Sequence, residues 1–177
     1  MNSLTKSLIF KIIVILIIIG SIFYTSINAQ HIEINNDFEY VLKSSEGYII
    51  IPDHFPTIQE GIDNSNPGDI IFVRAGIYIE NLVINQESIY LLGEDRFNTI
   101  IDGNNEESTI TLSSENTIIE NFTIIGGGFD KDVFSNFFRA GIRVTGSNNI
   151  ICNNIFRKNR LGISGVRVTN LTIKNNS

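Results

Sequence analysis

Three stretches of the sequence repeat one pattern: ENTIIEN at residues 115–121, SNNIICN at 147–153 and TNLTIKN at 169–175. All three have an asparagine at the second and seventh positions and an isoleucine at the fifth. The starts of the last two stretches are offset by 22, and those of the first two by 32, which is one such period plus ten extra positions. A spacing held over several positions indicates a repeat architecture of stacked structural units.

Short apolar runs fill these repeats and predict strands. The runs are rich in Ile, Val, Leu and Thr, are separated by Gly, Asn or Ser, and cover residues 69–73, 82–84, 89–92, 99–101, 109–112 and 117–119. Such runs are too short for helices and typical of strands. Three short strands in a repeat of about 20 residues make one coil of a solenoid, in which each strand pairs with its equivalent in the next coil. The sequence therefore predicts an all-β chain folded as a parallel β-helix.

The recurring asparagines are expected at the corners of the coils. Asn tolerates the left-handed backbone that a tight turn needs, and stacked amide side chains can form a hydrogen-bonded ladder. Residues 57–63 have a helical pattern instead, because Ile58 and Ile62 share a face and Thr57 and Glu60 have the spacing of a capping box. We expect this short N-terminal capping helix to cover the open apolar end of the solenoid.

Residues 1–29 have the pattern of an export signal. Two lysines come before or at the start of an apolar run, and small residues up to Ala29 provide a cleavage site. The alternative is an uncleaved signal anchor, the one membrane contact we expect, because the apolar stretch 8–24 approaches the length of a membrane span. Either signal places the remainder outside the cytoplasm, secreted or at the cell surface. We divide that remainder into a lead-in at 30–48 and the β-helix at 49–177.

Composition excludes several classes of protein. The chain has 177 residues, a formal net charge of −6 and one cysteine, Cys152. An acidic chain lacks the basic face of a nucleic-acid binder, and a single cysteine excludes a disulfide framework or a cysteine-rich zinc site. We expect Cys152 to be a buried, inert thiol.

The β-helix region, over roughly residues 49–177, resembles a known superfamily. The runs at 55–62, 66–73 and 75–81, followed by SIYLLGE at 88–94 and TIIDG at 99–103, are similar to the start of right-handed parallel β-helix proteins of the pectin lyase-like superfamily. The resemblance implies a right-handed, single-stranded β-helix. It implies no particular reaction, because pectin methylesterases, polysaccharide lyases, NosD-type domains and surface proteins share these motifs. The later Asn-rich coils look most like the NosD-type and surface members.

The sequence offers little for catalysis. A pectin esterase needs paired aspartates and an arginine, and Asp102 belongs to a turn with no partner motif after it. A lyase needs a calcium site of several carboxylates, so Ca²⁺ is expected only under that alternative. A copper site, which the NosD-type resemblance suggests, needs His, Cys or Met ligands, but His31, His54 and Cys152 are far apart in the sequence. We predict no catalytic residue, no metal site and no cofactor.

The ten-residue insertion between the first two stretches is the candidate ligand-binding loop, because solenoids carry function on loops that interrupt their coils. Four phenylalanines there can stack on sugars, or alternatively pack on the sheet. The candidate residues are Phe129, Asp130, Asp132, Phe134, Phe137, Phe138, Arg139 and Arg143. Nearby Arg157, Arg160 and Arg167 either meet an acidic polysaccharide or are solvated surface charge.

Three sequons, at Asn121, Asn170 and Asn175, are glycosylation candidates on an exported chain. The alternative is that an Asn-rich repeat containing Thr and Ser produces such triplets by chance.

The chain stops at Ser177 inside a coil, so we expect a product truncated at its C-terminus, with further coils or a partner at the open end. Two functions follow from the sequence. The favoured one is an exported, non-catalytic β-helix module that binds carbohydrate or has a structural role at the cell surface, with a polysaccharide or cell-surface component as partner. The alternative is a polysaccharide lyase or pectin esterase, or the N-terminal part of one.

Overall fold

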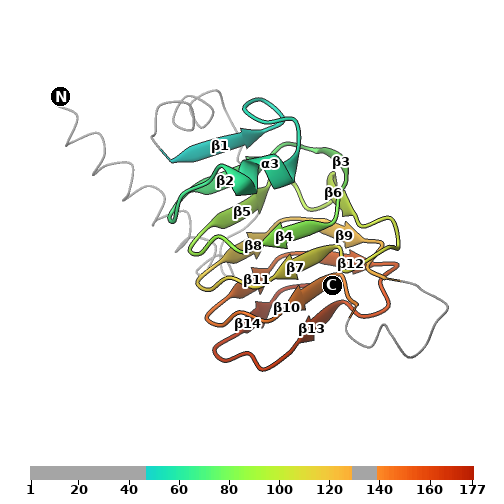
Figure 1. Cartoon of the computed structure of the whole chain (residues 1–177). Helices are drawn as coiled ribbons and strands as arrows, with labels where there is room; N and C mark the ends of the chain where they lie inside the picture. The colour runs from blue at the N-terminus through green and yellow to red at the C-terminus, as the bar shows by residue number, and fades with distance from the viewer. Residues whose placement is uncertain (1–46, 129–138) are drawn as a thin grey trace, which may run out of the picture. The chain divides into compact units, whose positions relative to one another are not determined.

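The computed structural model describes residues 47–128 and 139–177, and Figure 1 shows how they are arranged. In these ranges the chain forms three sheets of parallel strands and one short helix, and it passes from sheet to sheet as it winds through successive coils (Figure 1). This arrangement confirms the right-handed parallel β-helix that the repeats and the resemblance predict. Residues 1–46, which contain the expected signal and most of the lead-in, lie outside the described residues.

Each sheet collects one strand from each coil. Sheet A has six strands in the order β1 (Tyr48–Ile51), β2 (Ile70–Val73), β5 (Tyr90–Gly93), β8 (Ile118–Glu120), β11 (Ile150–Cys152) and β14 (Thr172–Lys174). Sheet B has the order β3 (Gly76–Ile79), β6 (Thr99–Asp102), β9 (Thr123–Ile125) and β12 (Ile155–Arg157). Sheet C has the order β4 (Leu82–Ile84), β7 (Ile110–Leu112), β10 (Ile142–Val144) and β13 (Ile163–Gly165).

The register of the strands follows the sequence offsets. In sheet A, Ile151 pairs with Ile119 on one side and with Ile173 on the other, at the predicted offsets of 32 and 22. In sheet C, Ile142 pairs with Ile110 at the same offset of 32. For the coils that contain the three repeats, the pattern therefore predicts which of these strands lie side by side and the residue at which they pair.

Aliphatic side chains fill the interior between the sheets. Ile71, Leu91, Ile119 and Ile151 occupy one inward column of sheet A, and each is 0% exposed. Complete burial of one such side chain stabilises a fold by about 1.5–3 kcal/mol. The column is therefore the main source of attraction between coils, together with the ladder hydrogen bonds.

The repeat asparagines turn the corners, as predicted. All six have positive φ angles of 52–65°: Asn116, Asn121, Asn148, Asn153, Asn170 and Asn175. The side-chain ladder is confirmed only in part. Asn170 donates through Nδ2 to Asn148 Oδ1 at 3.0 Å, but Asn153 donates to Glu120 instead.

A second set of asparagines, which the repeat pattern does not predict, points into the structure. The Asn154 side chain is 0% exposed; its Oδ1 accepts from Phe122 N at 3.0 Å and its Nδ2 donates to Ile119 O at 3.0 Å. The same pair of bonds to the preceding coil is made by Asn149, Asn159 and Asn176. Each of these side chains bonds to the backbone of the preceding coil and thereby joins two coils.

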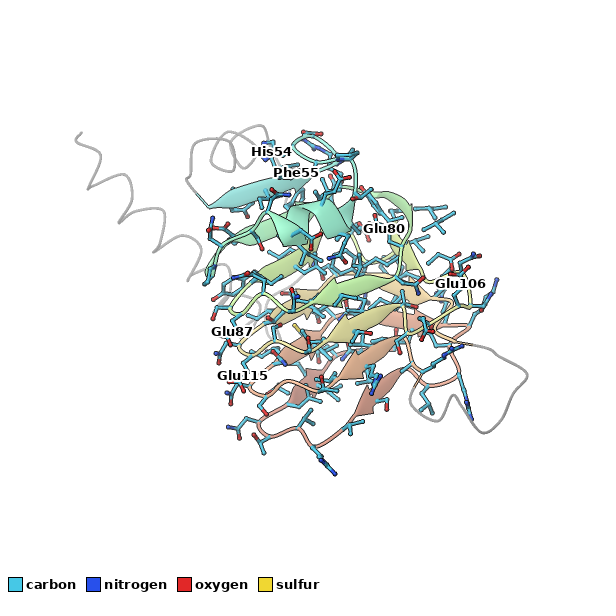
Figure 2. All side chains as sticks on the ribbon, viewed as in Figure 1. His54, Phe55, Glu80, Glu87, Glu106 and Glu115 are labelled. Carbon is cyan, nitrogen blue, oxygen red and sulfur yellow. The ribbon has the colours of Figure 1, made fainter. Side chains whose placement is uncertain are left out.

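The expected capping helix is α3 (Ile58–Asp63), which packs against β1, β2 and β4. Thr57 accepts from Glu60 N at 3.1 Å, which confirms half of the capping box. Glu80 provides the other capping contacts, since its carboxylate accepts from Ile58 N and Gln59 N, both at 3.0 Å. Figure 2 shows Glu80 beside this helix.

Gln59 extends the cap to the edge of sheet C. Its Oε1 accepts from Val83 N at 2.8 Å and its Nε2 donates to Val83 O at 3.1 Å. The amide thus takes the place of a neighbouring strand along β4, which protects an edge that would otherwise expose unpaired backbone groups. Among residues 47–128 and 139–177, no helix has the length and apolar character of a membrane span.

Candidate ligand-binding face

The two ends of the ten-residue insertion meet at a cluster of glycines. A Cβ placed on Gly128 would overlap the Arg139 side chain, and one on Gly127 would overlap the Ala140 backbone. The insertion therefore leaves the coil and returns to it at one point. Six candidate residues fall within 129–138, outside the described residues: Phe129, Asp130, Asp132, Phe134, Phe137 and Phe138.

Hydrogen bonds hold this base of the insertion to neighbouring coils. Gly127 N donates to Asn159 Oδ1 at 2.7 Å, while Gly127 O accepts from Arg160 N at 3.0 Å. On the returning side, Ala140 N donates to Ser108 Oγ at 3.1 Å. The insertion is therefore attached at both ends to backbone that is hydrogen-bonded to neighbouring coils.

Arginines gather around the corner between sheets B and C, and we call Arg139, Arg143, Arg157 and Arg160 the basic corner. The pairing of β7, β10 and β13 places Glu107, Arg139 and Arg160 at equivalent positions of successive coils. Arg139 Nη2 lies 2.9 Å from Glu107 Oε1. Neighbouring coils are about 4.8 Å apart, so these side chains form a charged column.

The other two arginines flank that column on the sheets. Arg143 is on β10, where it pairs with Thr111 and Ser164, and it faces outward between two inward neighbours. Arg157 is exposed at the end of β12. Arg167, which was also expected nearby, lies in the turn between β13 and β14, at a different corner. The predicted arginine cluster is thus reduced by one member.

Guanidinium groups arranged in this way suit carboxylate ligands. Arg is planar, remains charged, and can donate two parallel hydrogen bonds to one carboxylate. Glu107 already shows this preference by pairing with Arg139. Glu107 is not among the predicted site residues, although positions 107 and 139 are separated by the same offset of 32 that relates the first two repeats.

Carboxylates, which an esterase or lyase would need in pairs, are rare on the described strands. Glu120 is the one acidic strand residue of sheet A, Asp102 is that of sheet B, and the strands of sheet C that the structure describes have none. Asp102 Oδ1 accepts from Asn104 N at 2.9 Å, so the residue stabilises its own turn as expected. The described strands therefore do not bring two carboxylates together on one sheet.

The residues considered for copper do not assemble a metal site in the described part of the chain. His54 Nδ1 accepts from Ile50 N at 3.2 Å and so caps a turn, while His31 lies outside the described ranges. In residues 47–128 and 139–177, no three His, Cys, Asp or Glu side chains gather as metal ligands would.

Cys152 is 4% exposed, as the prediction of a buried thiol requires. It pairs with Glu120 on β8 and with Lys174 on β14. Burial, followed by the negative charge of Glu120, raises the pKa of the Cys152 thiol to about 12, and Lys174 opposes this shift. At neutral pH the group is therefore a protonated thiol, which is a poor nucleophile.

The three sequons differ in their surroundings. Asn121 is half-buried, and the hydroxyl of its Thr123 donates to Arg96 O at 2.6 Å. Asn170 and its Thr172 are both exposed, as are Asn175 and Ser177.

The fold and these contacts define a class of protein, a right-handed parallel β-helix with outward loops and few acidic groups on its strands. No family model matches the chain. A cell surface glycoprotein of Methanothermus fervidus is 41% identical over 76 residues, which are 41% of this chain and 12% of that relative.

Solved structures with a similar fold include pectin methylesterases. One, solved in complex with a hexasaccharide, aligns with a TM-score of 0.54 and 16% identity, over 73% of this chain and 49% of its own. The pectin methylesterase PemA of Erwinia chrysanthemi aligns with a TM-score of 0.51 and 19% identity, over the same shares. At such identities the likeness shows the fold alone. The chain spans about half the length of these enzymes.

Proposed function

We propose that this chain is an exported β-helix module of the cell surface that binds carbohydrate and does not catalyse a reaction. The main support for this proposal is the combination of a parallel β-helix with a stretch that is 41% identical to a cell surface glycoprotein. The signal pattern of residues 1–29 supports export. An exported β-helix offers stacked corners whose loops can vary while the interior stays constant.

The proposed ligand is an acidic polysaccharide, bound at the basic corner. Arg139, Arg143, Arg157 and Arg160 come from neighbouring coils and supply guanidinium groups to successive carboxylates of a uronate-type chain. Because the chain as a whole is acidic, these four guanidinium groups supply the local positive charge that an anionic ligand needs. The phenylalanines of the insertion are proposed to stack on the sugar rings beside it.

The alternative of a pectin esterase or polysaccharide lyase has weaker support. Such chemistry needs an acid and a base or nucleophile within reach of one bond, and the described strands hold Glu120 and Asp102 on different sheets. A finer relation to NosD-type domains stays a prediction that rests on the Asn-rich coils.

The binding proposal is tested by titrating the full chain with polygalacturonate oligosaccharides in a calorimeter. The double variant Arg143→Ala with Arg157→Ala is expected to weaken binding at least tenfold, and added salt should weaken it further. Arg167→Ala is the matched control, because it removes one surface charge at another corner. Equal affinities for the wild type and the double variant would contradict the role of the basic corner. Release of methanol from methyl-esterified pectin, or of unsaturated sugar from polygalacturonate, by the wild type would contradict the non-catalytic assignment.

A further inference from the structure

We propose that Asn170 carries an N-linked glycan on the exported chain, and that Asn121 remains unmodified. This inference rests on the proposed function, since only an exported chain meets the enzyme that attaches such glycans. The structure supplies what the sequons alone lack, which is a reason to distinguish Asn170 from Asn121.

Asn170 belongs to an exposed column. Asn116 and Asn148 occupy the same corner in earlier coils, and both remain exposed although further coils stack beyond them. The exposure of Asn170 is therefore a property of this corner and does not depend on what lies next to the last described coil. The hydroxyl residue of the sequon, Thr172, is exposed in the last described coil, at the strand position that Ile150 and Ile118 occupy half-buried in earlier coils.

The column of Asn121 and Asn175 has different surroundings. Asn121 and Asn153 are half-buried where coils stack on both sides, and the Asn153 amide is bonded to Glu120 at 2.6 Å. Thr123, the hydroxyl residue of the Asn121 sequon, is 6% exposed and donates to a backbone carbonyl. A transferase that must reach both the amide and the hydroxyl finds neither open at Asn121. Asn175 occupies the same corner in the last described coil, where its side chain is exposed.

The hydrogen bond of Asn170 is compatible with modification. Its Nδ2 donates one hydrogen to Asn148 Oδ1 at 3.0 Å. A primary amide has two N–H groups, so a glycosylated Nδ2 keeps one donor for the ladder bond. The glycan would then extend from the outer side of the corner without opening the coil.

The transfer requires a donor in which an oligosaccharide is linked through phosphate to a polyprenol, and a separate transferase. The bond between the anomeric carbon and the phosphate oxygen breaks, and the polyprenyl phosphate leaves with the electron pair. A new bond forms between the anomeric carbon and Asn170 Nδ2, which loses one proton to a base of the transferase. No electrons are exchanged with an oxidant or reductant.

Tryptic mapping of the full chain tests this proposal, because cleavage after Arg167 and Lys174 releases residues 168–174 with Asn170 as their one sequon asparagine. The chain is produced with its own signal in a host that N-glycosylates exported proteins, alongside a reporter of known occupancy. The exported fraction is then analysed by intact mass and by mass spectrometry of this peptide. We expect one glycan on 168–174, retained in Thr172→Ser and lost in Thr172→Val.

Two results would overturn the proposal in distinguishable ways. An exported chain with an unmodified 168–174 peptide, or with a glycan at Asn121, refutes the assignment and leaves the proposed function standing. A chain that is retained inside the cell contradicts the proposed function and the glycan together.

Discussion

Asparagine has two structural roles in this chain, and they differ by where the side chain points. Corner asparagines such as Asn116 and Asn148 have positive φ angles and exposed amides. Coil-joining asparagines such as Asn154 are buried and bond to backbone N–H and C=O groups of another coil. Because an unsatisfied buried backbone group costs about 1–3 kcal/mol, we expect substitution of a coil-joining asparagine to destabilise the fold more than substitution of a corner asparagine.

Asn154→Ala is expected to lower the free energy of unfolding by about 2–4 kcal/mol, because it leaves Phe122 N and Ile119 O without their side-chain partner. Urea denaturation followed by circular dichroism measures the change. Asn85→Ala, at an exposed turn position, is the control and should stay within about 0.5 kcal/mol of the wild type. A loss for Asn154→Ala as small as that of the control would refute the coil-joining role.

Cys152 is expected to make stability fall at alkaline pH. The folded thiol has its pKa raised from 9.0 to about 12, so between these values it keeps a proton that the unfolded thiol has lost. Its contribution is complete below about pH 9 and declines as the pH rises towards 12. The free energy of unfolding of the wild type should therefore fall more steeply over this range than that of Cys152→Ala. Parallel curves for the two proteins would rule out the effect.

The sequence predicts the corner asparagines better than the coil-joining ones, for a physical reason. A recurring Asn between apolar runs indicates a turn, and the turn positions are confirmed by the φ angles. In pairs such as Asn153–Asn154, however, both residues have the same side chain. Which of them turns inward depends on the neighbouring coil, and that information is not local to the sequence.

At the scale of elements, α3 covers the first coils and makes hydrogen bonds to β4 that a neighbouring strand would otherwise make. Gln59 pairs with Val83 as a strand would, and Glu80 accepts from the first N–H groups of the helix. Helix position and Thr57 capping follow from the sequence. The Glu80 contact cannot be predicted in this way. Ile58 and Gln59 are 22 and 21 positions from Glu80, and they come close to it only when the chain returns through β3.

Glu80→Ala is expected to lower the free energy of unfolding by about 1–2 kcal/mol, since two N–H groups at the start of α3 lose a charged acceptor. Hydrogen exchange should show the loss first in α3 and β4. Glu87→Ala serves as the control, because Glu87 is an exposed turn residue (Figure 2). Unchanged exchange in α3 of the Glu80 variant would exclude this cap.

Deletion of residues 129–138 is expected to preserve the fold. Gly128 and Arg139 already meet, and the shortened coil would have the same offset of 22 as its neighbour. Because a shorter loop costs slightly less entropy to close, the free energy of unfolding should change by less than about 1 kcal/mol. Thermal unfolding and circular dichroism check this, and loss of the β-sheet spectrum would show that the insertion is part of the fold.

At the scale of the molecule, the sequence predicts the architecture and leaves the function open. Periodic apolar runs indicate the buried interior, and the two repeat offsets, 22 and 32, give the register of the later strands of sheet A and of β7 with β10. The earlier coils have other offsets, such as 20 between Ile71 and Leu91, which the repeats do not predict. A binding surface has no such period. The basic corner arises because Arg139, Arg157 and Arg160 come together only when sheets B and C are folded, and Arg167, near in sequence, lies elsewhere.

The location of the mature chain tests the central claim most directly. The full chain, tagged after Ser177, is produced with its own signal, and intact cells are treated with an external protease before the tag and a cytoplasmic marker are detected. We predict that the tag is lost from intact cells, or found in the medium, while the cytoplasmic marker is preserved. A tag that stays protected in intact cells and is digested only after lysis would contradict an exported surface β-helix.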